Sequence, residues 1–125
     1  MRALALAAVL VAGVTFAQAD ELNPTGQWQV STGESRYRIS LCGDGSELCA
    51  KLTWLRDDAK TDDNLSLLNR YVVHKAKPDD GNTWVGTMQY DGSTYEATAT
   101  LLSSDAIELR SCSGVFCRSF TLNRL

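Results

Sequence analysis

Apolar and polar residues alternate along eight separate stretches of the chain. In residues 35–42, for example, Tyr37, Ile39 and Leu41 fall on one face, and arginines and a serine fall on the other. Alternation with a period of two is typical of a β-strand with one buried face. The other seven stretches that are predicted to be strands are 26–31, 48–55, 71–77, 83–90, 94–101, 106–112 and 117–124.

Short turns separate most of these stretches. Residues 43–45, 78–82 and 91–93 are rich in Gly, Asp, Asn, Ser and Pro, which favour tight turns between antiparallel strands. Residues 56–69 are polar and acidic, and predict a long loop with one helical turn. Sequential hairpins favour an all-β, antiparallel, eight-stranded up-and-down barrel, because closure removes the free edges of a sheet.

The alternation also predicts which side chains point into the barrel. Several of them are small, such as Ala50, Ala76, Gly86, Ala97 and Ala99. These residues either leave room for one small ligand or make room for the tryptophans of a filled core, and both alternatives fit a barrel of eight strands. The predicted inward set is Trp28, Val30, Tyr37, Ile39, Leu41, Ala50, Leu52, Trp54, Val72, His74, Ala76, Trp84, Gly86, Met88, Tyr90, Tyr95, Ala97, Ala99, Leu101, Ile107, Leu109, Phe120 and Leu122.

The first residues have the pattern of a secretory signal peptide. Arg2 precedes an apolar run of about 14 residues, and Ala17-Gln18-Ala19 forms an A-x-A cleavage site. This run is shorter than the roughly 20 residues that cross a bilayer, although an uncleaved N-terminal anchor is the alternative. We therefore expect a signal peptide over 1–19, a single β-barrel domain over 20–125, and a periplasmic or secreted protein with no membrane span after cleavage.

Charge and motif content exclude several functions. The chain has 12 Lys and Arg residues and 15 Asp and Glu residues, and loss of Arg2 would leave a net charge of about −4. An acidic domain is an unlikely partner for nucleic acid. The chain contains no Ser-His-Asp or Cys-His arrangement and no glycine-rich phosphate loop, and the acidic residues of 56–69 lack the spacing of a calcium loop. We expect no enzyme activity, no cofactor and no metal site.

All four cysteines lie in the predicted exported part of the chain. An even number of cysteines in a small exported domain indicates disulfides. Of the three possible pairings, strand parity and proximity favour Cys42 with Cys49 and Cys112 with Cys117, each across its own hairpin on the outward face. The C-x6-C and C-x4-C spacings differ from the C-x2-C of zinc and dithiol redox sites.

Motifs spread over the predicted mature chain resemble those of the bacterial DUF2147 family. The most specific ones are W-x-G at 84–86, Y-D-G-x-T-Y-x-A over 90–97, and the L-R-x-C pattern that starts at Leu109 and continues through Arg118 and Arg124. The N-terminal G-x-W at 26–28 and Cys42 through Leu55 also match. The resemblance implies a small secreted or periplasmic barrel of the lipocalin or calycin type, and it implies little about activity.

The G-x-W motif is also similar to the start of lipocalins, in which a late arginine packs over the tryptophan. By this resemblance Arg124 on the last strand packs over Trp28 on the first. Such a cation–π contact would close the barrel and contribute about 0.5–2 kcal/mol.

Two functional hypotheses follow from these observations. The first is a barrel that binds a small apolar or amphipathic ligand, with one polar anchor at His74. The second is a protein-interaction or inhibitor module, or an envelope structural protein, with a filled barrel and an N-terminal arm over residues 20–25. The ligand-binding residues predicted under the first hypothesis are Trp28, Trp54, His74, Trp84, Met88, Tyr90 and Tyr95.

Overall fold

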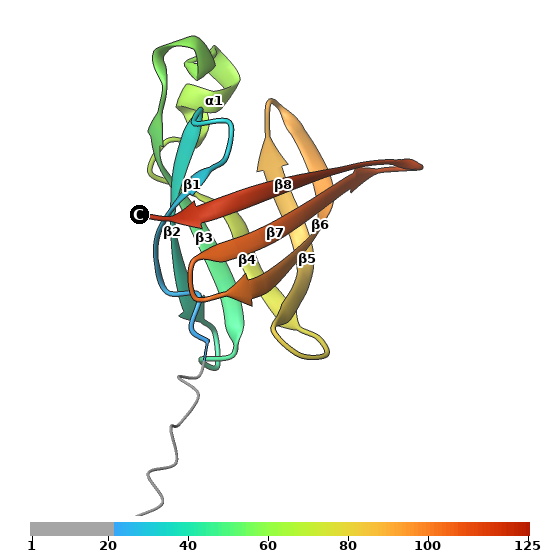
Figure 1. Ribbon diagram of the computed structural model, residues 1–125. Coiled ribbons are helices and arrows are strands. Elements are labelled where there is room, and N and C mark those ends of the chain that lie inside the picture. The colour runs from blue at the N-terminus through green and yellow to red at the C-terminus, as the bar shows by residue number, and fades with distance from the viewer. Residues whose placement is uncertain (1–21) are drawn as a thin grey trace, which may run out of the picture.

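The chain folds into a closed antiparallel barrel of eight strands (Figure 1). The computed structural model describes residues 22–125, so the predicted signal peptide over 1–19 lies outside the described residues. Each strand pairs with the next along the chain, and β8 pairs with β1, which confirms the predicted architecture. The strands are β1 (Gly26–Val30), β2 (Ser35–Cys42), β3 (Glu47–Leu55), β4 (Tyr71–Pro78), β5 (Thr83–Tyr90), β6 (Ser93–Ser103), β7 (Ala106–Ser113) and β8 (Phe116–Arg124).

Apolar side chains fill the inside of the barrel. Trp28 and Leu52 are fully buried, and the cavity that remains between the core residues has a volume of about 30 Å³. That volume holds little more than one water molecule. A Cβ atom on Gly86 would lie 3.0 Å from both Cα and Cβ of Ala76, so these small residues allow β4 and β5 to approach closely. The interior is therefore a packed core without room for a ligand.

The described N-terminal residues lie at the lower end of the barrel as drawn in Figure 1, and the indole of Trp28 donates a hydrogen bond there to the carbonyl oxygen of Pro24. The guanidinium carbon of Arg124 lies 4.4 Å from the centre of the Trp28 ring, so the predicted contact is present. Arg124 also donates hydrogen bonds to the carbonyl oxygens of Asn23, Thr25 and Ser104 at 2.6–2.7 Å. Four segments thus meet at one arginine: the N-terminal residues, β1, the β6–β7 turn and β8.

Residues 22–25, the described part of the predicted N-terminal arm, pack against the barrel, so the prediction of a free arm is wrong for these residues. Pro24 is fully buried, and its carbonyl oxygen accepts a hydrogen bond of 2.8 Å from the indole nitrogen of Trp28. Leu22 packs against the core. These residues are held against the barrel because they cover its lower end.

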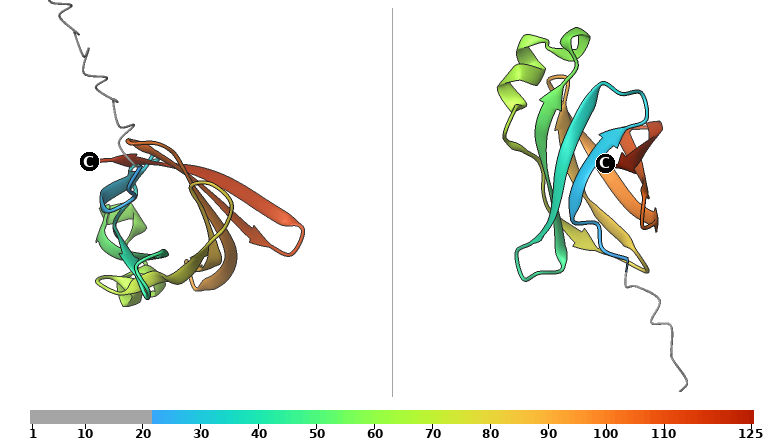
Figure 2. Two further views of the ribbon diagram at one scale, coloured as in Figure 1. Left: turned by 90° about the horizontal axis from the view of Figure 1, so that it is seen from below. Right: turned by 60° about the vertical axis from the view of Figure 1, so that its left-hand side comes forward.

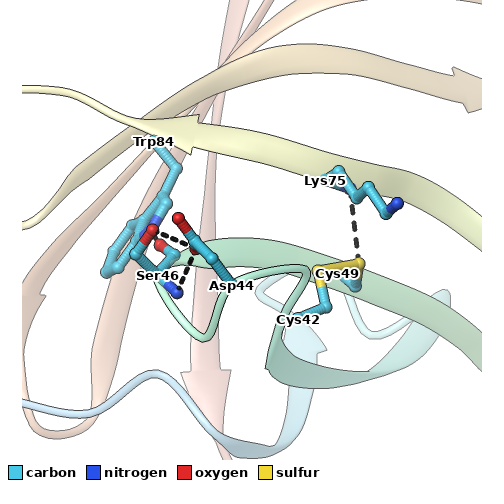
Figure 3. Close-up of a disulfide and its surroundings, with 6 residues drawn as sticks. All are labelled: Cys42, Asp44, Ser46, Cys49, Lys75 and Trp84. Carbon is cyan, nitrogen blue, oxygen red and sulfur yellow. Dashed lines mark hydrogen bonds between the residues drawn. A yellow bond between two sulfur atoms is a disulfide. The ribbon is translucent and has the colours of Figure 1, made fainter.

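The two disulfides are the pairs that strand parity favours. Cys42 bonds to Cys49 across the β2–β3 turn, with a Cα separation of 6.0 Å, and Cys112 bonds to Cys117 across the β7–β8 turn, with a separation of 4.0 Å. Cys49 is buried rather than exposed on the outer face, because β4 covers it and the Lys75 amide donates to its sulfur (Figure 3). In the same close-up, the Trp84 indole nitrogen donates to the Ser46 carbonyl oxygen at 2.9 Å, which fixes the turn beside this disulfide.

Three residues of the predicted inward set are exposed. Trp54 lies outside because a bulge in the β2–β3 ladder shifts the register between Arg36 and Tyr37, and the Arg36 guanidinium stacks on the Trp54 ring at 4.4 Å. His74 lies outside because β4 carries an extra residue near Lys75, whose φ is 56°. One inserted residue reverses the faces of every residue beyond it. Leu41, near the end of β2, is also exposed.

The acidic loop between β3 and β4 lies at the upper end of the barrel, above the β1–β3 side (Figure 1). It contains a short 3₁₀ helix, η1 (Asp57–Ala59), and one α-helix, α1 (Asp62–Leu67). The buried Asn64 side chain donates to the carbonyl oxygen of Ala59 at 2.9 Å and to the Asp91 carboxylate at 2.8 Å. It also accepts from the Asp91 amide at 3.1 Å, so one amide group joins the loop to the β5–β6 turn.

Candidate functional site

A cleft of about 500 Å³ opens at the upper end of the barrel. This volume is within the usual range for small-molecule sites, about 300–1,000 Å³. Its walls come from the β1–β2 loop, the β5–β6 turn and the β7–β8 hairpin. The lining residues are Glu34, Met88, Tyr90, Asp91, Ser93, Tyr95, Ser111, Ser113, Phe116, Arg118 and Phe120.

The cleft exists because β7 and β8 are longer than β1, the strand that pairs with β8 on its other side. β1 is only five residues long and pairs with β8 from Leu122 to Arg124. The remainder of β8 pairs with β7 alone, and this hairpin projects away from the barrel (Figures 1 and 2). Its inward positions, among them Ser111 and Arg118, which are directly paired, therefore face an open space instead of a packed core.

Three hydroxyl groups lie where the cleft meets the core. Ser35 is buried and its Oγ donates to the Tyr37 hydroxyl at 2.9 Å. Burial raises the pKa of Tyr37 well above its ordinary value. The Tyr90 hydroxyl oxygen is also buried, and it has no hydrogen-bond partner among residues 22–125. Burial and the nearby Glu34 carboxylate raise the pKa of Tyr90. Tyr90 is thus neutral near pH 7, and its hydroxyl can donate to or accept from a ligand.

The cleft carries charges of both signs. Glu34 and Asp91 supply carboxylates, and Arg118 supplies a guanidinium. The ion pairs found in the described part of the chain are Arg56 with Asp58 and Lys60 with Asp57, so none of the three cleft charges is in one. The Asp91 carboxylate accepts a hydrogen bond from Asn64, and the Glu34 carboxylate and the Arg118 guanidinium are in no ion pair within residues 22–125.

Residues 26–124 match the family described as "Uncharacterized protein conserved in bacteria (DUF2147)". The chain belongs to the DUF2147 family. No curated protein matches it, and no solved structure matches it. The matched residues include every strand of this DUF2147 barrel and the whole cleft. Two disulfides in a chain of a bacterial family are consistent with an extracytoplasmic protein. Within residues 22–125, no helix is both long and apolar enough to cross a membrane.

The predicted ligand-binding residues of this DUF2147 protein are divided among three places. Met88, Tyr90 and Tyr95 line the cleft. Trp28 and Trp84 belong to the core and hold the lower end of the barrel closed. Trp54 and His74 lie on the outer surface, so they cannot contact a ligand in the cleft, and His74 is not its polar anchor.

Sequence reasoning did not identify the charged residues of the site. Arg118 shares the parity of Phe120 and Leu122 in the last strand, and this signal could have placed it on the inner face. Glu34 and Asp91 lie in turns, where alternation carries no information about direction. The geometry of the hairpins brings these residues to one cleft.

Proposed function

We propose that this DUF2147 protein binds a small amphipathic molecule in the cleft at the upper end of the barrel. The supporting observation is the contrast between two spaces. The interior has about 30 Å³ free, whereas the cleft has about 500 Å³, an aromatic lining and the unpartnered Tyr90 hydroxyl. A ligand that bonds to this hydroxyl would gain one hydrogen bond, which contributes about 0.5–1.5 kcal/mol.

Burial against aromatic side chains would supply most of the affinity. Met88, Tyr95 and Phe120 form an apolar surface against which a ligand could pack. A molecule of 15–20 heavy atoms that gains about 0.3 kcal/mol per atom would bind with about 4.5–6 kcal/mol. This corresponds to a Kd on the order of 100 μM, which suits a molecule present at high local concentration.

The proposed role is binding without chemical change of the ligand. The protein's one histidine, His74, is on the outer surface, away from the cleft. All four cysteines are in disulfides. The cleft serines therefore have no histidine or thiolate beside them to provide an activating base.

Filling the cleft tests this proposal. The apolar dye N-phenyl-1-naphthylamine becomes fluorescent in an apolar site and would report binding. Ser113 lines the cleft, whereas Ser119 lies on the other face of the same hairpin, opposite Arg110. We expect Ser113→Trp to abolish saturable dye binding and Ser119→Trp, the matched control, to retain it. Equal binding by both variants would contradict the proposed site.

We also propose that the protein is exported to the periplasm or the medium after cleavage at residue 19. The bacterial family and the two disulfides support export. Intact mass of the protein isolated from the cell envelope tests this. The expected chain begins at Asp20 and lacks four hydrogen atoms relative to the reduced form, and a chain beginning at Met1 would contradict cleavage.

A protein-interaction role is the second candidate function. Val115 and Phe116 are 90% and 80% exposed at the tip of the β7–β8 hairpin, where the Cys112–Cys117 bond fixes the turn. Exposed apolar side chains on a fixed protrusion suit insertion into a partner. A photo-crosslinking residue placed at position 115 in cells should give one discrete adduct that the same residue at position 119 does not give. Identical results from both positions would exclude the tip.

A further inference from the structure

The two signs of charge in the cleft come from different parts of the barrel mouth. Glu34 is in the β1–β2 loop, and Asp91 is in the β5–β6 turn, where Asn64 fixes its carboxylate. Arg118 is on β8, in the hairpin that projects away from the β1–β2 loop (Figures 1 and 2). The cleft therefore has an acidic part and a basic part.

Carboxylates lie near the Tyr90 hydroxyl at the acidic part of the cleft. Burial is the main cause of the raised pKa of Tyr90; the negative charges of Glu34, Asp91 and Asp58 also act to raise it, and the Ser35 hydroxyl acts to lower it. The Tyr90 end of the cleft thus contains the carboxylates of Glu34 and Asp91, and the hairpin part contains the guanidinium. Apolar surface from Met88 and Phe120 also lines the cleft.

We propose that the cleft selects a zwitterionic ligand, a free amino acid or short peptide with apolar side chains. Its ammonium group binds at Glu34 and Asp91, its carboxylate binds at Arg118, and its side chains pack on Tyr95 and Phe120. This inference rests on the proposed function, because it names the class of molecule that the same cleft binds.

Ligands with one kind of charge fit these residues less well. A fatty acid would pair with Arg118 and leave Glu34 and Asp91 facing its apolar body. An organic cation would pair with the carboxylates and leave Arg118 without a partner. Only a ligand with both charges satisfies all three groups, and each charge that is left unpaired on desolvation lowers affinity.

The size of the cleft limits the length of such a peptide. A compact space of 500 Å³ is about 8–10 Å across, and an extended chain spans at most about 3.3–3.6 Å per residue. The cleft therefore accommodates about two or three residues between its acidic and basic parts, so a dipeptide is a suitable probe.

Blocked dipeptides provide the test, by isothermal titration calorimetry at low salt. The probes are leucyl-phenylalanine with both termini free, its N-acetyl form and its C-terminal amide. We expect each block to weaken binding to the wild-type protein by about five- to tenfold. This effect is at the low end for charge-assisted contacts, because Arg118 is exposed and solvent weakens its interaction with a carboxylate. Equal affinity for all three probes would overturn the inference.

Charge-neutral variants assign each end of the ligand to its residue. Arg118→Gln should remove the preference for the free carboxylate and keep the preference for the free ammonium group, and Glu34→Gln should reduce only the preference for the ammonium group. Arg110→Gln is the matched control, because Arg110 is an exposed arginine on the outer face of the same hairpin. If Arg118→Gln weakens binding of the free and amidated peptides equally, Arg118 does not bind the carboxylate and the inference is overturned.

The outcome is distinguishable from failure of the proposed function. If N-phenyl-1-naphthylamine binds in a manner that Ser113→Trp abolishes while no dipeptide binds, the cleft is a ligand site and the zwitterion inference is wrong. If the dye binds equally to wild-type protein and Ser113→Trp, the proposed function itself is wrong.

Discussion

Removal of the Arg124 side chain should be among the most destabilising surface substitutions in this protein. In Arg124→Ala, three hydrogen bonds to carbonyl oxygens and the contact with Trp28 are lost together. Exposed hydrogen bonds contribute about 0.5–1 kcal/mol each, at the low end of the measured range. A cation–π contact at such a site adds about 0.5–1 kcal/mol. We therefore expect the free energy of unfolding to fall by about 2–4 kcal/mol.

A second arginine in the same chain serves as the matched control. Arg36 stacks on Trp54 at the same distance as Arg124 on Trp28, 4.4 Å. Trp54 is 38% exposed, however, and the Arg36 side chain makes one hydrogen bond, to Gln29. Arg36→Ala should therefore cost less than about 1 kcal/mol, in the range of ordinary surface contacts.

Urea unfolding followed by tryptophan fluorescence and by circular dichroism measures both variants. A loss of about 3 kcal/mol in a domain of about 100 residues also lowers Tm by roughly 12–24 °C. If Arg124→Ala and Arg36→Ala lower the free energy of unfolding by the same amount, stacking on an indole ring is sufficient to account for both effects. Arg124 would then not stabilise the protein by joining four segments.

Three further predictions concern the loop, the buried tyrosine and the hairpin disulfide. Asn64→Ala should cost about 2–3 kcal/mol in urea unfolding and speed hydrogen exchange of residues 56–69, because the bonds to Ala59 and Asp91 are lost; unchanged exchange would contradict this role. Burial raises the pKa of Tyr37 from its ordinary value of 10.0. The unfolded state therefore loses the Tyr37 proton at lower pH than the folded state does. The contribution of Tyr37 to the free energy of unfolding should be fully present below pH 10 and should fall as pH rises above it. Tyr37→Phe should make this alkaline fall less steep, and an unchanged slope would contradict the assignment. Replacing both Cys112 and Cys117 by Ser should cost about 2 kcal/mol, as the entropy of a short closed loop predicts, and a negligible change in the urea midpoint would contradict it.

Strand parity predicted the barrel well wherever the ladders are regular. It placed residues such as Ile39, Ala97 and Ile107 in the core, because a period of two fixes which face is buried. It failed at Trp54 and His74, where bulges insert one residue. Nothing in the residue types near Lys75 indicates that this position adopts a positive φ. The alternation therefore does not predict which side chains point inward beyond a bulge.

The candidate site was only partly predictable for a different reason. Met88, Tyr90 and Tyr95 were expected to line a cavity inside the barrel, and they line the cleft at its upper end instead. The position of the cleft depends on the unequal lengths of β1 and β8. Alternation predicts that these strands exist, but it places their ends only to within about two or three residues. The role of the buried Asn64 within the polar loop over 56–69 was not predicted, because its partner Asp91 is 27 residues away in sequence.

The most direct test of the central claim is an amide chemical-shift titration of the isotopically labelled protein with N-phenyl-1-naphthylamine. We expect saturable shifts for the cleft residues Tyr90, Tyr95 and Arg118, with the interior signals of Leu52 and Ile107 unchanged. Saturable shifts centred on Leu52 and Ile107 would show that the ligand enters the barrel, and would contradict a binding site at its mouth.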